Sequence, residues 1–212
     1  LAVGQAVTAY PSGKKSTIKQ IVTFEGEQPS AIAGQAITVT LNDEIDISRG
    51  DWLVPSDDSV TLTNRALAYL VWFNDQPLQA GRLYDLKLAT RKTSVSINRL
   101  NHKVNVNTLA QEAAEQVAMN DIALVELELT ETLPLDTFKN QPGTGNFILI
   151  DRLTNATVAA GLIQNVLAEE KATTNISAFE LELNALIRKH FPHWGARDVR
   201  ELFNTEPPKA DQ

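Results

Sequence analysis

The sequence predicts a mainly β fold, built as antiparallel barrels or sandwiches and followed by one α-helix near the C-terminus. Three observations carry this prediction. Strand-like apolar alternation dominates the chain up to about residue 166. Turns rich in proline and glycine separate these stretches at spacings of about 10 residues, which favours a barrel or a sandwich over alternating strands and helices. Beyond them, apolar residues recur at helical spacing.

The first predicted domain covers residues 1–57. Strands are expected at residues 16–24 and 35–41, and a short strand follows the turn at Gly50 and stops at Pro55. The expected core positions are Ile18, Val22 and Phe24 in the first strand and Ile37, Val39 and Leu41 in the second. Residues 56–64 are polar, so we place the domain boundary there.

The second predicted domain covers residues 65–168. Its strands are expected at residues 67–73, 83–88, 93–100, 104–106, 122–129, 147–150 and 158–162. Residues 108–121 are rich in alanine and form either a short helix or an irregular excursion. In the last two strands, residues 147–150 are expected to be buried on both faces, whereas Val158, Ala160 and Leu162 share one face. Asp151 and Arg152 then orient the polar turn between these strands or meet a neighbouring domain.

Residues 169–212 form a predicted tail with a helix at about residues 177–191. Ser177 and Glu180 match a capping box, and Pro192 ends the helix. The apolar stripe must be buried somewhere, so we take it as a packing surface against the protein's own barrels or, second, as an interface with a partner subunit. Its residues are Phe179, Leu183, Leu186, Ile187, Phe191 and Trp194.

Composition excludes several classes of function. The net charge of −7 disfavours nucleic acid as a partner, because nucleic-acid binders cluster Lys and Arg against phosphates. The chain has no cysteine, so it can form neither a disulfide nor a thiolate site, and a cytoplasmic location is the simplest setting. No apolar run approaches the roughly 20 residues that span a bilayer, so we expect no membrane partner.

Short motifs that imitate functional sites have simpler interpretations. SGKKST, residues 12–17, lacks the first glycine of a phosphate-binding loop, has Lys15 where Ser or Thr is required, and lies between strands; a β-turn is favoured. The acidic residues 43–51 lack the calcium-loop spacing, and Arg49-Gly50-Asp51 is better interpreted as a tight turn. His190 and His193 flank a proline and lack an obvious third ligand. We therefore assign no catalytic, cofactor-binding or metal-binding residue.

Several segments together resemble a known family. They are LAVGQAVTAYPSGKKSTIKQIVTFEGE, AIAGQAITVTLNDEIDISRGDWLV, LVWFNDQPLQAGRLYDLKL, HKVNVNTL, FILIDRLTNATVAAGLI and SAFELELNALIRKHFPHWGARD. In this order they resemble the C-terminal part of the GTPase-type subunit 1 of bacterial sulfate adenylyltransferase, which is built like elongation factor Tu. The resemblance implies two antiparallel barrels of the elongation factor Tu type, the first incomplete, plus the C-terminal helix.

The resemblance also implies a function. In this family a GTP-binding domain hydrolyses GTP and so drives the transfer of AMP from ATP to sulfate, which makes adenosine 5′-phosphosulfate on a separate small catalytic subunit. The phosphate-binding loop and the Asn-Lys-x-Asp motif have no counterpart here, so GTP and Mg²⁺ are expected in an N-terminal domain absent from this chain. The implied partners are the small subunit, as a heterodimer, and that N-terminal domain. This chain alone is predicted to be inactive.

Two alternatives remain open at this point. Similar barrels serve translation factors, so the pair could bind tRNA or the ribosome, although the acidic composition weighs against this. The chain could also be a scaffold fragment without a separable activity.

Overall fold

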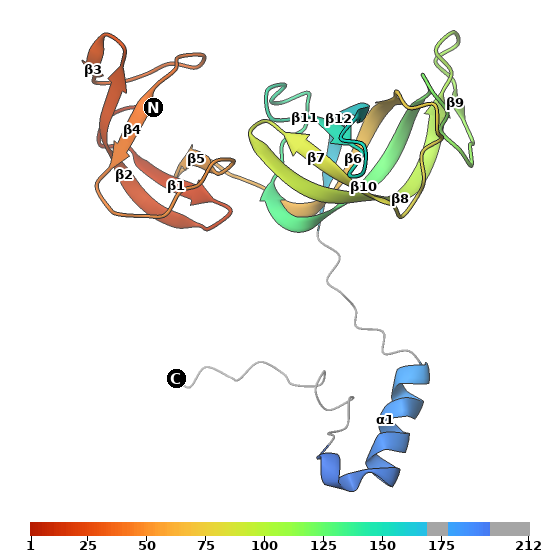
Figure 1. Cartoon of the computed structure of the whole chain (residues 1–212). Coiled ribbons are helices and arrows are strands. Elements are labelled where there is room, and N and C mark those ends of the chain that lie inside the picture. Colours follow the sequence, from red (N-terminus) through yellow and green to blue (C-terminus); the bar gives the residue numbers. More distant parts are fainter. Residues whose placement is uncertain (169–177, 196–212) are drawn as a thin grey trace. The chain divides into compact units, whose positions relative to one another are not determined.

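The computed structural model describes residues 1–168 and 178–195 (Figure 1). Contacts within the chain divide it into two units, Leu1–Glu169 and Glu170–Gln212. The first unit contains two β-sheets, and the described residues of the second form an α-helix followed by a short 3₁₀-helix. The mainly β class and the C-terminal helix are therefore confirmed.

The first sheet is curled but open. Its strands pair antiparallel in the order β3-β2-β1-β5, and β4 also pairs with β2. They are β1 (Ala6–Tyr10), β2 (Lys14–Thr23), β3 (Gly26–Gln28), β4 (Thr38–Leu41) and β5 (Trp52–Pro55). Val7, Ile18 and Ile21 are fully buried in its small core, and the predicted residues Ile37, Val39 and Leu41 pack against them. This sheet is the incomplete barrel that the resemblance implied.

Phe24 is not a core residue, which corrects the sequence prediction. The register between β2 and β4 shifts between Ile18 and Gln20, so a bulge inserts one residue into the strand. Because side chains alternate with a period of two, this insertion moves all later residues to the opposite face. Ile21 is therefore buried where Val22 was expected, and Phe24 stands fully exposed at the following turn.

The second sheet closes into a six-stranded barrel. The strands pair in the order β10-β6-β12-β11-β7-β8, and pairing of β8 with β10 closes the barrel. The short strand β9 also pairs with β8. The strands are β6 (Leu62–Trp72), β7 (Leu83–Leu88), β8 (Arg91–Val104), β9 (Gln111–Glu112), β10 (Ile122–Pro134), β11 (Asn146–Ile150) and β12 (Thr157–Leu167). Closure leaves none of these six strands with a free edge.

Large and small side chains share the interior of the barrel. Trp72 and Tyr84 are almost fully buried, and their rings meet edge to face at 5.8 Å between centroids. The indole of Trp72 donates a hydrogen bond of 2.8 Å to the carbonyl of Gln76, so its polar atom is satisfied. Ala66 and Ala68 face the same interior from β6.

A second bulge corrects the prediction for β12. Thr157 pairs with Ile150 and Ala159 pairs with Leu149, so Val158 is the extra residue between them. Val158 is buried inside the barrel, whereas Ala160 is half-buried and Leu162 is 42% exposed on the outer surface. The three residues therefore do not share one face, because the bulge reverses the alternation between Val158 and Ala160.

The remaining described elements are short. Residues 108–121 contain only β9 and turns, so the irregular excursion is observed rather than the helix. In the second unit, α1 (Ala178–His190) is followed by η1 (Pro192–Trp194). No helix among the described residues is long and apolar enough to cross a membrane.

Candidate interaction surfaces

The turn between β11 and β12 is held by Asp151, which is 5% exposed. One carboxylate oxygen accepts hydrogen bonds of 2.9 Å from the backbone N–H groups of Leu153 and Thr154, and one of 3.2 Å from the Thr154 hydroxyl. The other oxygen accepts a charge-assisted hydrogen bond from Arg82. Both oxygens are therefore engaged in holding the backbone and a neighbouring loop, which confirms that Asp151 orients the turn.

These contacts also explain the electrostatics of the turn. The hydrogen bond from Thr154 N–H, the hydrogen bond from Leu153 N–H and the charge of Arg82 together hold the pKa of Asp151 below its usual range, against the effect of burial. Arg152 reaches Asp85 on β7 at 3.3 Å. Leu153, at the tip of the turn, is 84% exposed. A carboxylate that stays ionised and fully hydrogen-bonded stabilises structure and is poorly suited to accept a substrate proton.

The Arg49-Gly50-Asp51 sequence forms a tight turn, as predicted. Gly50 has a φ of +100°, and a methyl group at this position would lie 2.8 Å from a side-chain carbon of Arg91. Asp51 accepts a hydrogen bond of 2.8 Å from the N–H of Ser48, and it forms an ion pair with Arg91 at 3.3 Å. Arg91 also pairs with Glu131 at the end of β10. Asp51 is thus used in an ion-pair network and is not presented to an external receptor.

The other imitations of functional motifs also form ordinary structure. The phosphate-loop imitation is a hairpin turn at Gly13, with a φ of +71°, and it leads directly into strand β2. Without a helix N-terminus behind it, this turn does not fit a nucleotide phosphate. Asp43 accepts a hydrogen bond of 2.8 Å from the Ser16 hydroxyl. Within the described ranges, no group of three or more His, Asp or Glu side chains is arranged to hold a metal ion.

The predicted tail interface lies mostly on α1 and η1. Leu183 and Leu186 are 44% and 55% exposed, and Phe191 and Trp194 stack at 4.7 Å between ring centroids. Ile187 is half-buried. Phe179 lies outside the side chains that the structure describes. The role of this stripe as a packing or partner surface stays a prediction.

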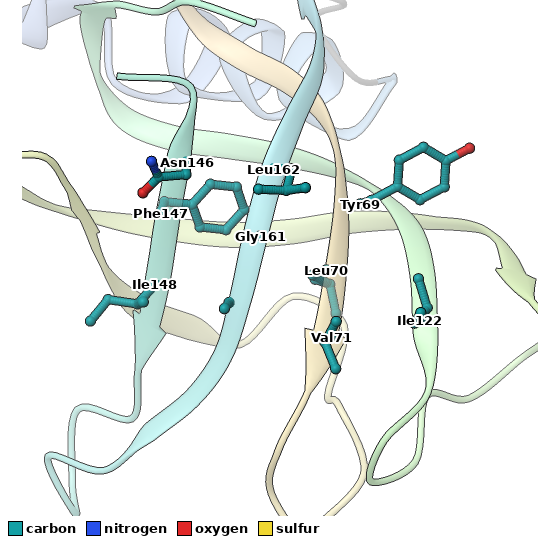
Figure 2. A pocket seen from close by; sticks show the side chains of 10 residues that line it. Tyr69, Leu70, Val71, Ile122, Asn146, Phe147, Ile148, Gly161 and Leu162 are labelled. Atoms are coloured by element: carbon teal, nitrogen blue, oxygen red, sulfur yellow. The ribbon is translucent and has the colours of Figure 1, made fainter. Parts of the chain in front are cut away.

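A further surface, which sequence analysis missed, lies on the outer wall of the barrel. A groove of about 420 Å³ crosses β11, β12, β6 and β10 (Figure 2). Figure 2 shows Ile148 on β11, Val71 on β6 and Ile122 on β10, with Leu162 on the strand between the first two and Tyr69 on the same strand as Val71. The sequence signal for this groove is in the second half of β6, where the outward residues Leu67, Tyr69 and Val71 are apolar as well as the inward ones. A hairpin with one solvated face would alternate apolar and polar residues instead.

The pairing register arranges the groove residues in two lateral rows. Ile148 pairs with Ala160, Ala160 with Val71, and Val71 with Ile122. The second row joins Leu162 to Tyr69 and Tyr69 to Leu124. The apolar surface is therefore continuous across four strands, about 15 Å at the usual strand spacing.

The chain is similar in sequence to one family profile and to curated proteins. The family profile described as "GTP-eEF1A C-terminal domain-like" matches residues 65–164, which is the closed barrel. Sulfate adenylyltransferase subunit 1 of Aliivibrio salmonicida is 50% identical over 207 residues, covering 96% of this chain and 43% of that protein. The same subunit of Aliivibrio fischeri is 51% identical over 206 residues, with the same coverage of both chains.

Solved structures agree on the fold. Sup35 complexed with GDP superimposes with a TM-score of 0.73 at 21% identity, covering 79% of this chain and 42% of that one. Sup35 complexed with GMPPNP gives the same TM-score at 20% identity and the same coverage. At 20–21% sequence identity the likeness to Sup35 concerns the fold alone. The sequence identity of about 50% to the two sulfate adenylyltransferase subunits extends over nearly the whole chain and is the stronger relationship. The chain is therefore similar over nearly its whole length to sulfate adenylyltransferase subunit 1, and it spans less than half the length of these curated relatives.

Proposed function

We propose that this chain is the non-catalytic barrel portion of the GTPase-type subunit of sulfate adenylyltransferase. The complete enzyme couples GTP hydrolysis to the formation of adenosine 5′-phosphosulfate from ATP and sulfate, in the assimilation of sulfate. In this proposal GTP and Mg²⁺ bind to an N-terminal domain outside these residues, and adenylyl transfer takes place on the small catalytic subunit. The chain contributes rigid barrels and the surfaces that join these parts, in the cytoplasm.

One observation carries the proposal, namely the identity of about 50% to sulfate adenylyltransferase subunit 1 over 95–96% of the chain. The internal geometry is compatible with a supporting role. The buried carboxylate of Asp151 is saturated with hydrogen bonds, and the apolar outer groove lacks the convergent polar groups of a typical small-molecule site. A translation-factor role is supported only by likeness of fold, at 20–21% identity.

A chimeric protein tests the proposal. This chain replaces the matching 43% of Aliivibrio salmonicida sulfate adenylyltransferase subunit 1, in a bacterium that lacks its own subunit 1. We expect growth on sulfate as sole sulfur source with the chimera, and no growth with this chain alone. The aligned part of Sup35, which shares the fold at 21% identity, serves as the matched control insert and should not restore growth. Failure of a stable, well-expressed chimera to restore growth contradicts the proposed function.

A further inference from the structure

The outer wall of the second barrel has the composition of a covered surface. On β6 the outward residues Leu67, Tyr69 and Val71 are all large and apolar, and each is only half-buried. Their neighbours in the two rows, Ile148 and Leu162, extend the same character to β11 and β12. Contiguous apolar patches of this kind on soluble proteins mark interaction sites.

The charges around this wall are mostly paired within the barrel. Arg65 pairs with Glu126 on one side of the rows, and Lys103 pairs with Asp121 at 2.9 Å on the other. Lys87 differs from these residues. It pairs in register with Ile148 at the end of the first row, is exposed, and has no ion-pair partner among the described residues. The groove therefore offers an incoming chain an apolar floor and one positive charge.

The apolar character of the wall discriminates between possible occupants. Interfaces between domains of one chain resemble transient interfaces and are comparatively polar, whereas permanent interfaces between different chains are more hydrophobic. The relatives are named as subunit 1 of an enzyme, which implies a further subunit. Because charges across an interface tend to be complementary, we expect the occupant to carry a carboxylate opposite Lys87.

We propose that this wall of the second barrel is the docking site for the small subunit of the adenylyltransferase. The inference rests on the proposed function and deepens it. The small subunit contributes apolar side chains to the rows that contain Val71 and Leu162, and an acidic side chain to Lys87. Central apolar contacts supply most of the binding energy, and the peripheral ion pair sets orientation and association rate.

Two substitutions test the docking site without disturbing the core. Leu162→Glu places a charge among the rows at a position that is 42% exposed, and Lys87→Glu reverses the charge at their end. The matched controls are Leu153→Glu, at an 84% exposed leucine on the Asp151 turn, and Lys139→Glu, at an exposed lysine outside the groove. Thermal unfolding of each variant checks that the barrel remains folded.

Binding is measured between the purified chain and the purified small subunit encoded in the same genome. We expect Leu162→Glu to weaken the complex at least tenfold. Lys87→Glu should weaken it several-fold at low salt and less at 0.5 M salt, where exposed charges are screened. Both control variants should bind like the unmodified chain.

The outcomes separate this inference from the function on which it rests. If the unmodified chain binds and both groove variants bind equally well, the docking site is wrong and the proposed function stands. If the chain does not bind although the chimera restores growth, the small subunit docks elsewhere on the protein and the inference again fails alone. Loss of self-association of the chain in Leu162→Glu, with binding to the small subunit unchanged, would identify a second copy as the occupant and overturn the inference.

Discussion

Gly161 lies where the floor of the groove meets the interior of the barrel, and replacing it with alanine tests the packing directly. Its backbone lines the groove on the outer side, while Phe147 pairs with it in register and fills the space on the inner side. An added methyl group would lie 2.7 and 2.8 Å from two ring carbons of Phe147. Ordinary contact begins at about 3.4 Å, and the ring is only 2% exposed, so it cannot swing into solvent.

The expected cost of Gly161→Ala follows from this overlap. Overpacking a core typically costs about 1–3 kcal/mol. Alanine offsets about 0.4–1 kcal/mol of this cost, because it restricts the unfolded chain more than glycine does. Because all the contacts with the ring are shorter than 3.0 Å, the overpacking cost falls in the upper part of its range. We therefore expect a net loss in the free energy of unfolding of about 1–2.5 kcal/mol, measured by urea denaturation followed by circular dichroism.

A second substitution identifies the cause of the loss. In a Phe147→Leu background the ring is absent, so Gly161→Ala should cost less than half as much as in the unmodified chain. The double-mutant cycle therefore predicts a coupling between the two positions of about 1 kcal/mol. An equal cost in both backgrounds, or no cost in the unmodified chain, would refute the packing that we describe.

Three further predictions concern the turns and the two sheets. Gly145→Ala should lower the free energy of unfolding by about 3 kcal/mol in urea denaturation, because the added methyl group would lie 2.5 Å from the backbone of Phe138. The control is Gly143→Ala, which has open space around it and should change the free energy of unfolding by less than about 0.5 kcal/mol. Because the pKa of Asp151 is lowered in the folded protein, its ionised form stabilises the fold above about pH 4, and this contribution is lost at lower pH. The free energy of unfolding of Asp151→Asn should therefore fall less steeply with decreasing pH than that of the unmodified chain. In hydrogen exchange, strands of the open first sheet should exchange at least tenfold faster than barrel strands β6 and β10, and equal protection would contradict this.

Periodicity predicted where strands occur better than which way their residues face. Ile37, Val39 and Leu41 pack on one face as expected, because the extra residue of the bulge beside them belongs to β2 and leaves the alternation of β4 unbroken. The predictions that Phe24 lies in the core and that Val158 shares a face with Ala160 and Leu162 are wrong, because Phe24 follows a bulge and Val158 occupies one. A bulge depends on the pairing partner, which local alternation does not reveal.

The groove was missed for a related reason. Apolar runs such as residues 67–73 predict strands, but the sequence alone does not say which residues face outward after the barrel closes. Once the register is known, Tyr69 and Val71 on β6 lie beside Leu162 and Ile122 from strands distant in the sequence. Asp151 was more accessible to sequence reasoning, because Asp followed by a short polar segment is a common way to hydrogen-bond a turn.

The proposed function can be measured as the rate of adenosine 5′-phosphosulfate formation by the purified chimera with the small subunit present. We expect GTP to raise this rate at least tenfold, and the rise should be absent when this chain is replaced by the aligned part of Sup35. A folded chimera that hydrolyses GTP but shows no GTP-dependent increase would contradict the claim that these barrels serve sulfate adenylyltransferase.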